Sequence, residues 1–79
     1  LLSSSISFTI SAHRLLPSMA QFLPEDPVIL EAGAFDGEDA FRMSQIWPKG
    51  TIHTFEPVPF LFLKTKVRTY DCPNVHCYQ

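Results

Sequence analysis

The chain has 79 residues, of which six are lysine or arginine and eight are aspartate or glutamate, so its formal net charge is −2. This charge balance excludes the strongly basic surface typical of proteins that bind nucleic acids or anionic membranes. Apolar residues make up 46% of the sequence, but the chain is shorter than the ~100–150 residues of a typical domain. Because it also begins without methionine, we expect a fragment of a longer protein. No apolar run reaches the ~18 residues that a membrane span requires.

The first 26 residues are expected to form a lead-in to a domain that covers residues 27–79. Between Ile6 and Ala12, apolar residues alternate with small polar ones, a pattern compatible with a short strand, an irregular lead-in or the remainder of a signal peptide. Around Pro17, apolar residues recur at helical spacing and predict a short helix. Two prolines that bracket a turn then mark the boundary before the domain.

A buried strand followed by a glycine loop is predicted at the start of the domain. The apolar run Val28–Leu30 is continuous rather than alternating, which is typical of a parallel strand covered on both faces. Glu31 falls near the carboxyl end of this strand, where open α/β sheets bind their ligands. Gly33 and Gly37 follow in a G-x-x-x-G pattern. We expect Gly33 to take a positive φ and leave room for a ligand, and Gly37 to permit close packing.

The charges beside this loop favour a cationic ligand. Residues 38–47 carry apolar side chains at three- and four-residue spacing and predict a helix in which Trp47 is a core anchor. Asp36, Glu38 and Asp39 crowd the start of that helix and already complement its dipole, so a diphosphate there would be repelled. A ligand with a sulfonium cation, an ammonium group and ribose hydroxyls fits better, which favours S-adenosylmethionine (SAM). NAD stays as an alternative because the acidic side chains can point away.

A second strand is predicted to end in another acid. Residues 51–56 are β-branched and aromatic apart from His53 and the final Glu56. The separation from Gly37 to Glu56 is 19 positions, close to the ~20 at which dinucleotide folds place the carboxylate that binds ribose hydroxyls. The structural alternative is an exposed acid that caps the next helix. His53 is expected to be hydrogen-bonded or partly exposed rather than catalytic.

The second helix and the third strand complete the pattern. The helix is expected to open at Pro57-Val58-Pro59, and Val75–Tyr78 to begin the next strand. Four apolar residues spaced three and four apart predict the packed face of this helix, opposite a solvated basic face. The apolar residues are Phe60, Leu63, Val67 and Tyr70, and the basic ones are Lys64, Lys66 and Arg68.

The two cysteines are expected to be reduced. Cys72 and Cys77 are too few for a disulfide scaffold, which predicts free thiols and a cytoplasmic protein. Together with His53 and His76 they offer the residue types of a zinc site, but no C-x-x-C spacing supports one. We therefore expect no metal site.

The order strand, helix, strand, helix, strand predicts an α/β fold. We expect a Rossmann-like doubly wound parallel sheet of which only the first βαβαβ half is present, with an N-terminal helical lead-in. The strand that begins at Val28 should then pair, on its other edge, with a strand that the chain does not contain. An open apolar edge promotes association, so the isolated chain is expected to be poorly stable or to self-associate.

These motifs together resemble a known family. Glu31-Ala-Gly-Ala-Phe-Asp-Gly37, then Phe55-Glu-Pro-Val-Pro59, then Asn74-Val-His-Cys77 are similar to the opening of FkbM-type SAM-dependent methyltransferases. The resemblance covers about residues 27–79 and implies transfer of a methyl group from SAM to oxygen of a sugar or another small molecule. It implies that the methionine side of SAM is lined by Glu31, Gly33, Ala34 and Gly37, that Asp36 lies nearby, and that Glu56 holds the ribose.

Two other classes of function stay open. An NAD-dependent oxidoreductase is disfavoured by the acidic loop and by the lack of a G-x-G-x-x-G pattern. A degenerate or truncated domain that serves as a non-catalytic interaction module is the other alternative. The catalytic base and the methyl acceptor are not identified by any residue of the chain.

Overall fold

The structure, a computed structural model, describes residues 6–9 and 23–79. The helix predicted around Pro17 lies outside the described residues. The elements are β1 (Ile6–Thr9), β2 (Val28–Ala32), α2 (Glu38–Ile46), β3 (Thr51–Phe55), α3 (Pro59–Arg68) and β4 (Val75–Tyr78). From β2 onward, each predicted strand and helix is present within one or two residues of the bounds expected from the sequence.

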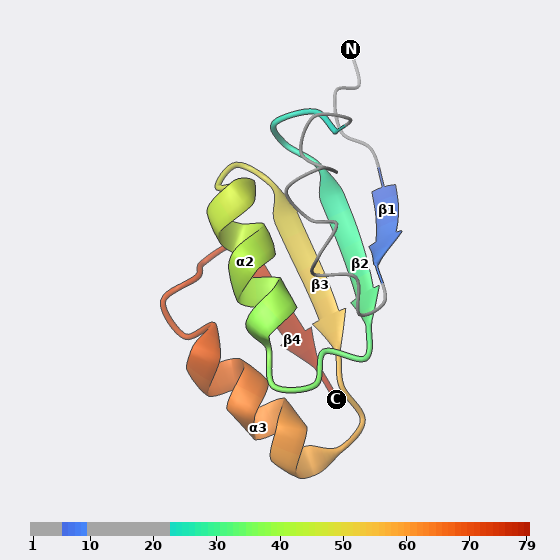
Figure 1. The fold of residues 1–79 in the computed structure, drawn as a ribbon, viewed down its shortest axis with the longest axis vertical. Coiled ribbons are helices and arrows are strands. Elements are labelled where there is room, and N and C mark those ends of the chain that lie inside the picture. Colours follow the sequence, from blue (N-terminus) through green and yellow to red (C-terminus); the bar gives the residue numbers. More distant parts are fainter. Residues whose placement is uncertain (1–5, 10–22) are drawn as a thin grey trace.

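The strands form one parallel sheet in the order β1-β2-β3-β4. Helices α2 and α3 connect successive strands from β2 to β4 and contact each other as well as the sheet. Figure 1 shows α2 in front of β3 and β4, with α3 beside it below. The predicted α/β class and its βαβαβ unit are confirmed.

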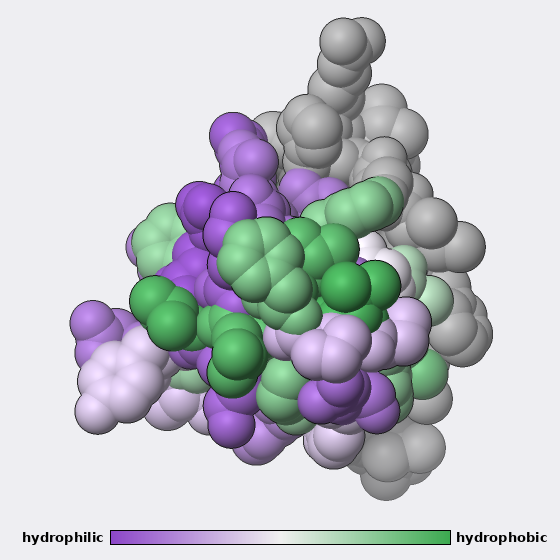
Figure 2. All heavy atoms as spheres, turned by 90° about the horizontal axis from the view of Figure 1, so that it is seen from below, coloured by the Kyte–Doolittle hydropathy of each residue, from purple (hydrophilic) through white to green (hydrophobic). Residues whose placement is uncertain are grey.

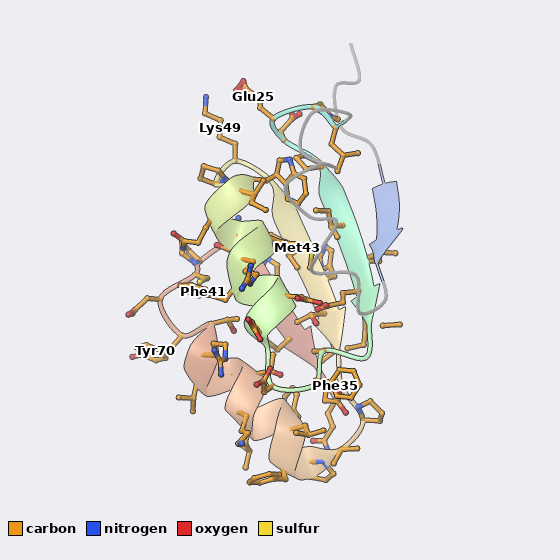
Figure 3. The ribbon with its side chains drawn as sticks, viewed as in Figure 1. Glu25, Phe35, Phe41, Met43, Lys49 and Tyr70 are labelled. Atoms are coloured by element: carbon orange, nitrogen blue, oxygen red, sulfur yellow. The ribbon has the colours of Figure 1, made fainter. Side chains whose placement is uncertain are left out.

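The core lies between this sheet and α2. It contains Ile29 of β2, Ile52 of β3, and Ala40 and Met43 of α2, together with Trp47 at the end of the helix. Figure 3 shows the Met43 side chain pointing from α2 toward the sheet. Trp47 is 3% exposed, which confirms it as a core anchor. Only one face of α2 carries these residues, in agreement with the spacing of apolar positions.

The expectation that β2 lacks a neighbour on its outer edge is wrong. The short strand β1 pairs with β2 in parallel, with Ile6 beside Val28 and Thr9 beside Glu31. The backbone groups on that edge of β2 therefore find partners within the chain, as buried backbone groups require. Of the alternatives for the N-terminal stretch, the short strand is the one found, and the edges of the described sheet are β1 and β4.

The face of α3 that packs inward is also different from the predicted one. Phe60, Leu63 and Val67 are 65%, 61% and 76% exposed, whereas Thr65 is fully buried and Thr69 is 5% exposed. The Thr69 hydroxyl donates to the Thr65 carbonyl, so the threonine face satisfies its own polar groups when buried. The spacing of the apolar residues alone therefore predicted the wrong buried face for this helix.

The carboxyl ends of the strands meet at one edge of the molecule. In Figure 1 the loop between β2 and α2 and the start of α3 lie together at this lower edge. Figure 2 looks onto the same edge and shows hydrophobic side chains grouped beside hydrophilic ones. No helix in the described part of the chain is long and apolar enough to cross a membrane.

Candidate functional site

The loop that follows β2 has an unusual backbone. Gly33 has a φ of 84°, as predicted, and Gly37 also has a positive φ, 89°. Phe35 between them also has a positive φ, 54°, although it has a side chain. A non-glycine residue takes this conformation only when its surroundings hold it there. The conformational energy of this backbone must therefore be offset by contacts with neighbouring residues.

Glu56 supplies the first of these contacts. It lies directly after β3, is 5% exposed, and its carboxylate accepts hydrogen bonds from two backbone N–H groups. Phe35 N donates to Oε1 over 2.7 Å, and Val58 N donates to Oε2 over 3.0 Å. One side chain thus joins the loop after β2 to the start of α3. Each carboxylate oxygen keeps a second lone pair for another donor.

Helix α3 holds the loop from the other side. Thr65 Oγ1 donates to the Phe35 carbonyl oxygen over 2.9 Å, so both ends of the Phe35 residue are bound. Arg68 Nε donates to the Asp36 carbonyl oxygen over 3.1 Å, and its Nη2 lies 3.4 Å from Asp36 Oδ2. Since these partners come from α3 and from the residue after β3, the loop is preorganised by the fold rather than by its own residues.

The two glycines differ in what surrounds them. A Cβ at Gly37 would lie 2.9 Å from Thr65 Cα, so α3 can approach the loop only because this position has no side chain. The predicted close packing at Gly37 is confirmed. A Cβ at Gly33 would meet nothing within 4 Å, which leaves open space next to the backbone. Space at Gly33 is what a bound ligand needs to reach the loop.

Glu31 is buried beneath the loop. Its side chain is 1% exposed, and its Oε1 accepts a hydrogen bond of 2.6 Å from Thr54 Oγ1 on the neighbouring strand. Burial raises the pKa of Glu31 from 4.5 to about 7; the Thr54 hydrogen bond opposes this shift, and the Asp39 and Glu56 carboxylates add to it. The carboxylates of Asp39 on α2 and of Glu56 after β3 thus favour the neutral, protonated form of Glu31.

A cleft of about 470 Å³ opens beside the loop. Of the six residues predicted to bind the cofactor, Ala34 and Asp36 line this cleft, and Phe35, 59% exposed, lies at its rim. Figure 3 shows Phe35 at the lower edge of the molecule, near the N-terminal end of α3. Glu31 and Glu56 support the loop from below rather than lining the cleft.

Several residues of the site were not singled out from the sequence. Thr54 and Thr65 were missed because their partners are set by strand register and by the rotation of α3, neither of which local spacing reveals. The available signal for Thr65 was an uncharged residue between two lysines on the predicted helix. The Arg68 contact joins residues 32 positions apart, and the sequence offers no sign of it.

Comparison with known proteins indicates a relation to methyltransferases. No family model matches the chain. Over 51 residues it is 41% identical to the 2-O-methyltransferase NoeI of Sinorhizobium fredii (strain NBRC 101917 / NGR234). The match covers 65% of this chain and 20% of that protein, so the chain spans about a fifth of its relative's length. This distant match and the parallel βαβαβ sheet are consistent with part of a SAM-dependent methyltransferase fold.

Proposed function

We propose that residues 27–79 form the cofactor-binding part of a SAM-dependent O-methyltransferase of the FkbM type. The observation that carries this proposal is the hydrogen bond from Phe35 N to the Glu56 carboxylate. It joins the glycine loop to the acid that ends the next strand, and these are the two motifs on which the resemblance rests. The match to a 2-O-methyltransferase supports the same reaction class.

The residues of the site fit the chemistry of SAM. The open space at Gly33 lets a ligand reach the backbone, and Ala34 and Asp36 face the cleft. The proposal assigns the lone pairs of Glu56 that Phe35 and Val58 leave over to the vicinal ribose hydroxyls. Glu31 and Gly37 have a positioning role, since the buried Glu31 ties β2 to Thr54 of β3 beneath the loop and Gly37 lets α3 fix the shape of the loop.

SAM supplies a methyl group made electrophilic by the sulfonium to which it is attached. The role proposed for this chain is to hold that group in one orientation beside an acidic surface and to keep the loop rigid. In such transfers much of the rate acceleration comes from positioning of the reacting atoms. The acceptor is proposed to be a small molecule or a sugar.

Isothermal titration calorimetry of the chain with SAM, S-adenosylhomocysteine and NAD tests this proposal. We expect SAM and S-adenosylhomocysteine to bind, and Glu56→Gln to weaken both by at least tenfold. Glu25→Gln is the matched control, since Glu25 pairs with Lys49 far from the loop on an exposed surface. NAD binding in place of SAM would indicate an oxidoreductase, and binding of none of the three would favour an interaction module; either result would overturn the proposal.

A further inference from the structure

A pair of histidines lies on the face of the sheet that is turned away from α2 and α3. His53 of β3 and His76 of β4 are register partners on neighbouring strands. Along β3 the buried positions Ile52 and Thr54 alternate with half-buried and exposed ones, so His53 belongs to the outer face. Neither histidine belongs to the candidate cofactor site described above.

The separation of the two rings suits a shared metal ion. Their centroids are 5.3 Å apart. In a tetrahedral complex the metal–nitrogen bond is about 2.0–2.1 Å, so each ring centre lies about 3.2 Å from the metal and two ring centres are about 5 Å apart. Because the ring planes are stacked at 24°, the His76 ring must turn to bring its nitrogen toward that of His53. His76 is exposed, and its turn requires no core rearrangement.

A hydrogen bond to Tyr78 favours the tautomer of His53 that can bind a metal ion. Its hydroxyl oxygen lies 2.9 Å from His53 Nδ1. When Nδ1–H donates to this oxygen, Nε2 carries the lone pair that a metal ion accepts. A hydrogen-bonded outer partner of this kind is typical of histidines that bind metals, and it fixes both the tautomer and the ring orientation.

The neighbouring thiol belongs to the other side of the strand. Cys77 Sγ lies 3.5 Å from Oγ1 of Thr69, the residue that follows α3. Among the described residues of β3 and β4, the outer face therefore offers two imidazoles, with the Tyr78 phenol bonded to one of them. Imidazole pairs favour late first-row divalent ions such as Zn²⁺, Ni²⁺ and Cu²⁺ over Mg²⁺ or Ca²⁺, which prefer oxygen ligands.

We infer that His53 and His76 form a two-imidazole site for a late first-row divalent metal ion, with water in the other coordination positions. The site does not depend on the proposed methyltransferase function, since both histidines lie on the outer face of the sheet and have no role in the proposed cofactor site. The described residues contain no cluster of three or more His, Cys, Asp or Glu side chains able to hold a metal. Binding is therefore expected to be in the micromolar range rather than that of a structural zinc centre.

Titration of the chain with Zn²⁺ under reducing conditions tests this inference. We expect one equivalent to bind, and His53→Ala and His76→Ala each to weaken binding at least tenfold. Tyr78→Phe should weaken it by about tenfold, as loss of an outer partner does. His13→Ala, which removes the remaining histidine of the sequence, is the matched control and should leave binding unchanged.

Three results would overturn the site. These are no Zn²⁺ binding by the unaltered chain, binding that survives His76→Ala, and binding that is lost in Cys77→Ser. Circular dichroism checks that each variant folds. If one does not, ¹⁵N NMR of the histidine rings in the unaltered chain decides the matter, because Zn²⁺ must shift Nε2 of His53 and a nitrogen of His76. Shifts confined to His13 would contradict the inference.

Discussion

Replacement of Glu56 by alanine should destabilise the fold as well as the proposed ligand site. The change removes the acceptor of two backbone N–H groups, those of Phe35 and Val58, at a position that is 5% exposed. A hydrogen bond to a charged group contributes about 1.5–3 kcal/mol, so for the two bonds together we expect a loss of about 3–6 kcal/mol in the free energy of unfolding. The positive φ of Phe35 would also lose one of the contacts that hold it.

This loss is large for so small a chain. A domain of this size has a total stability of about 4–12 kcal/mol, so Glu56→Ala should remove at least about a quarter of it in the absence of ligand. Glu56→Gln keeps one acceptor oxygen but brings an amide NH₂ toward a backbone donor, so we expect a smaller loss, about 2 kcal/mol.

Urea denaturation followed by circular dichroism measures these differences. Glu25→Ala is the control, because the Glu25 carboxylate pairs with Lys49 over 3.5 Å on an exposed surface, where such pairs contribute about 0–1 kcal/mol. If Glu56→Ala unfolds within about 0.5 kcal/mol of this control, the Glu56 carboxylate does not join the loop to α3, and the account of the site is wrong.

Three further predictions test other parts of the structure. The folded state raises the pKa of Glu31 from 4.5 to about 7, so protonated Glu31 adds about 3 kcal/mol to the free energy of unfolding below pH 4.5, and this stabilisation is lost as pH rises through 7. Denaturation curves between pH 4.5 and 8 should show the free energy of unfolding falling, and Glu31→Gln should reduce this pH dependence. Gly37→Ala should cost about 2–3 kcal/mol, since a Cβ there meets Thr65 Cα at 2.9 Å and φ is 89°; an unchanged thermal midpoint would argue against the packing of α3 on the loop. Leu63→Ser should change stability by less than about 0.5 kcal/mol because Leu63 is 61% exposed, whereas replacement of the buried Ile52 by alanine should cost about 2–4 kcal/mol. Equal effects of the two changes in urea titrations would indicate that the apolar face of α3 is buried in the core after all.

The sequence predicted the order and type of the elements from β2 onward because the local signals agree there. The apolar run that begins at Val28 marks the start of β2, and the glycines at 33 and 37 mark the loop before α2. Pro48 and Gly50 mark the end of α2. The positive φ of Gly33 was also predicted, since a sharp turn after a strand favours glycine in that conformation.

What the sequence did not reveal depends on contacts between distant residues. The rotation of α3 is set by Thr65, which packs where Gly37 has no side chain, and this preference outweighs the burial of Leu63 and Val67. The pairing of β1 with β2 joins segments more than twenty residues apart. Glu56 was predicted at the ligand edge, but its bond to the amide of Phe35 depends on the three-dimensional path of the loop.

The most direct test of the proposed function is an NMR titration of the ¹⁵N-labelled chain with SAM. The account predicts that the largest amide shifts fall on loop residues 33–37 and on Val58, because Phe35 and Val58 donate their N–H groups to the Glu56 carboxylate. The same titration of Glu56→Gln should show these shifts only at SAM concentrations at least tenfold higher. Saturable shifts confined to other parts of the chain, or equal affinity in the variant, would contradict the claim that the loop and Glu56 together bind the cofactor.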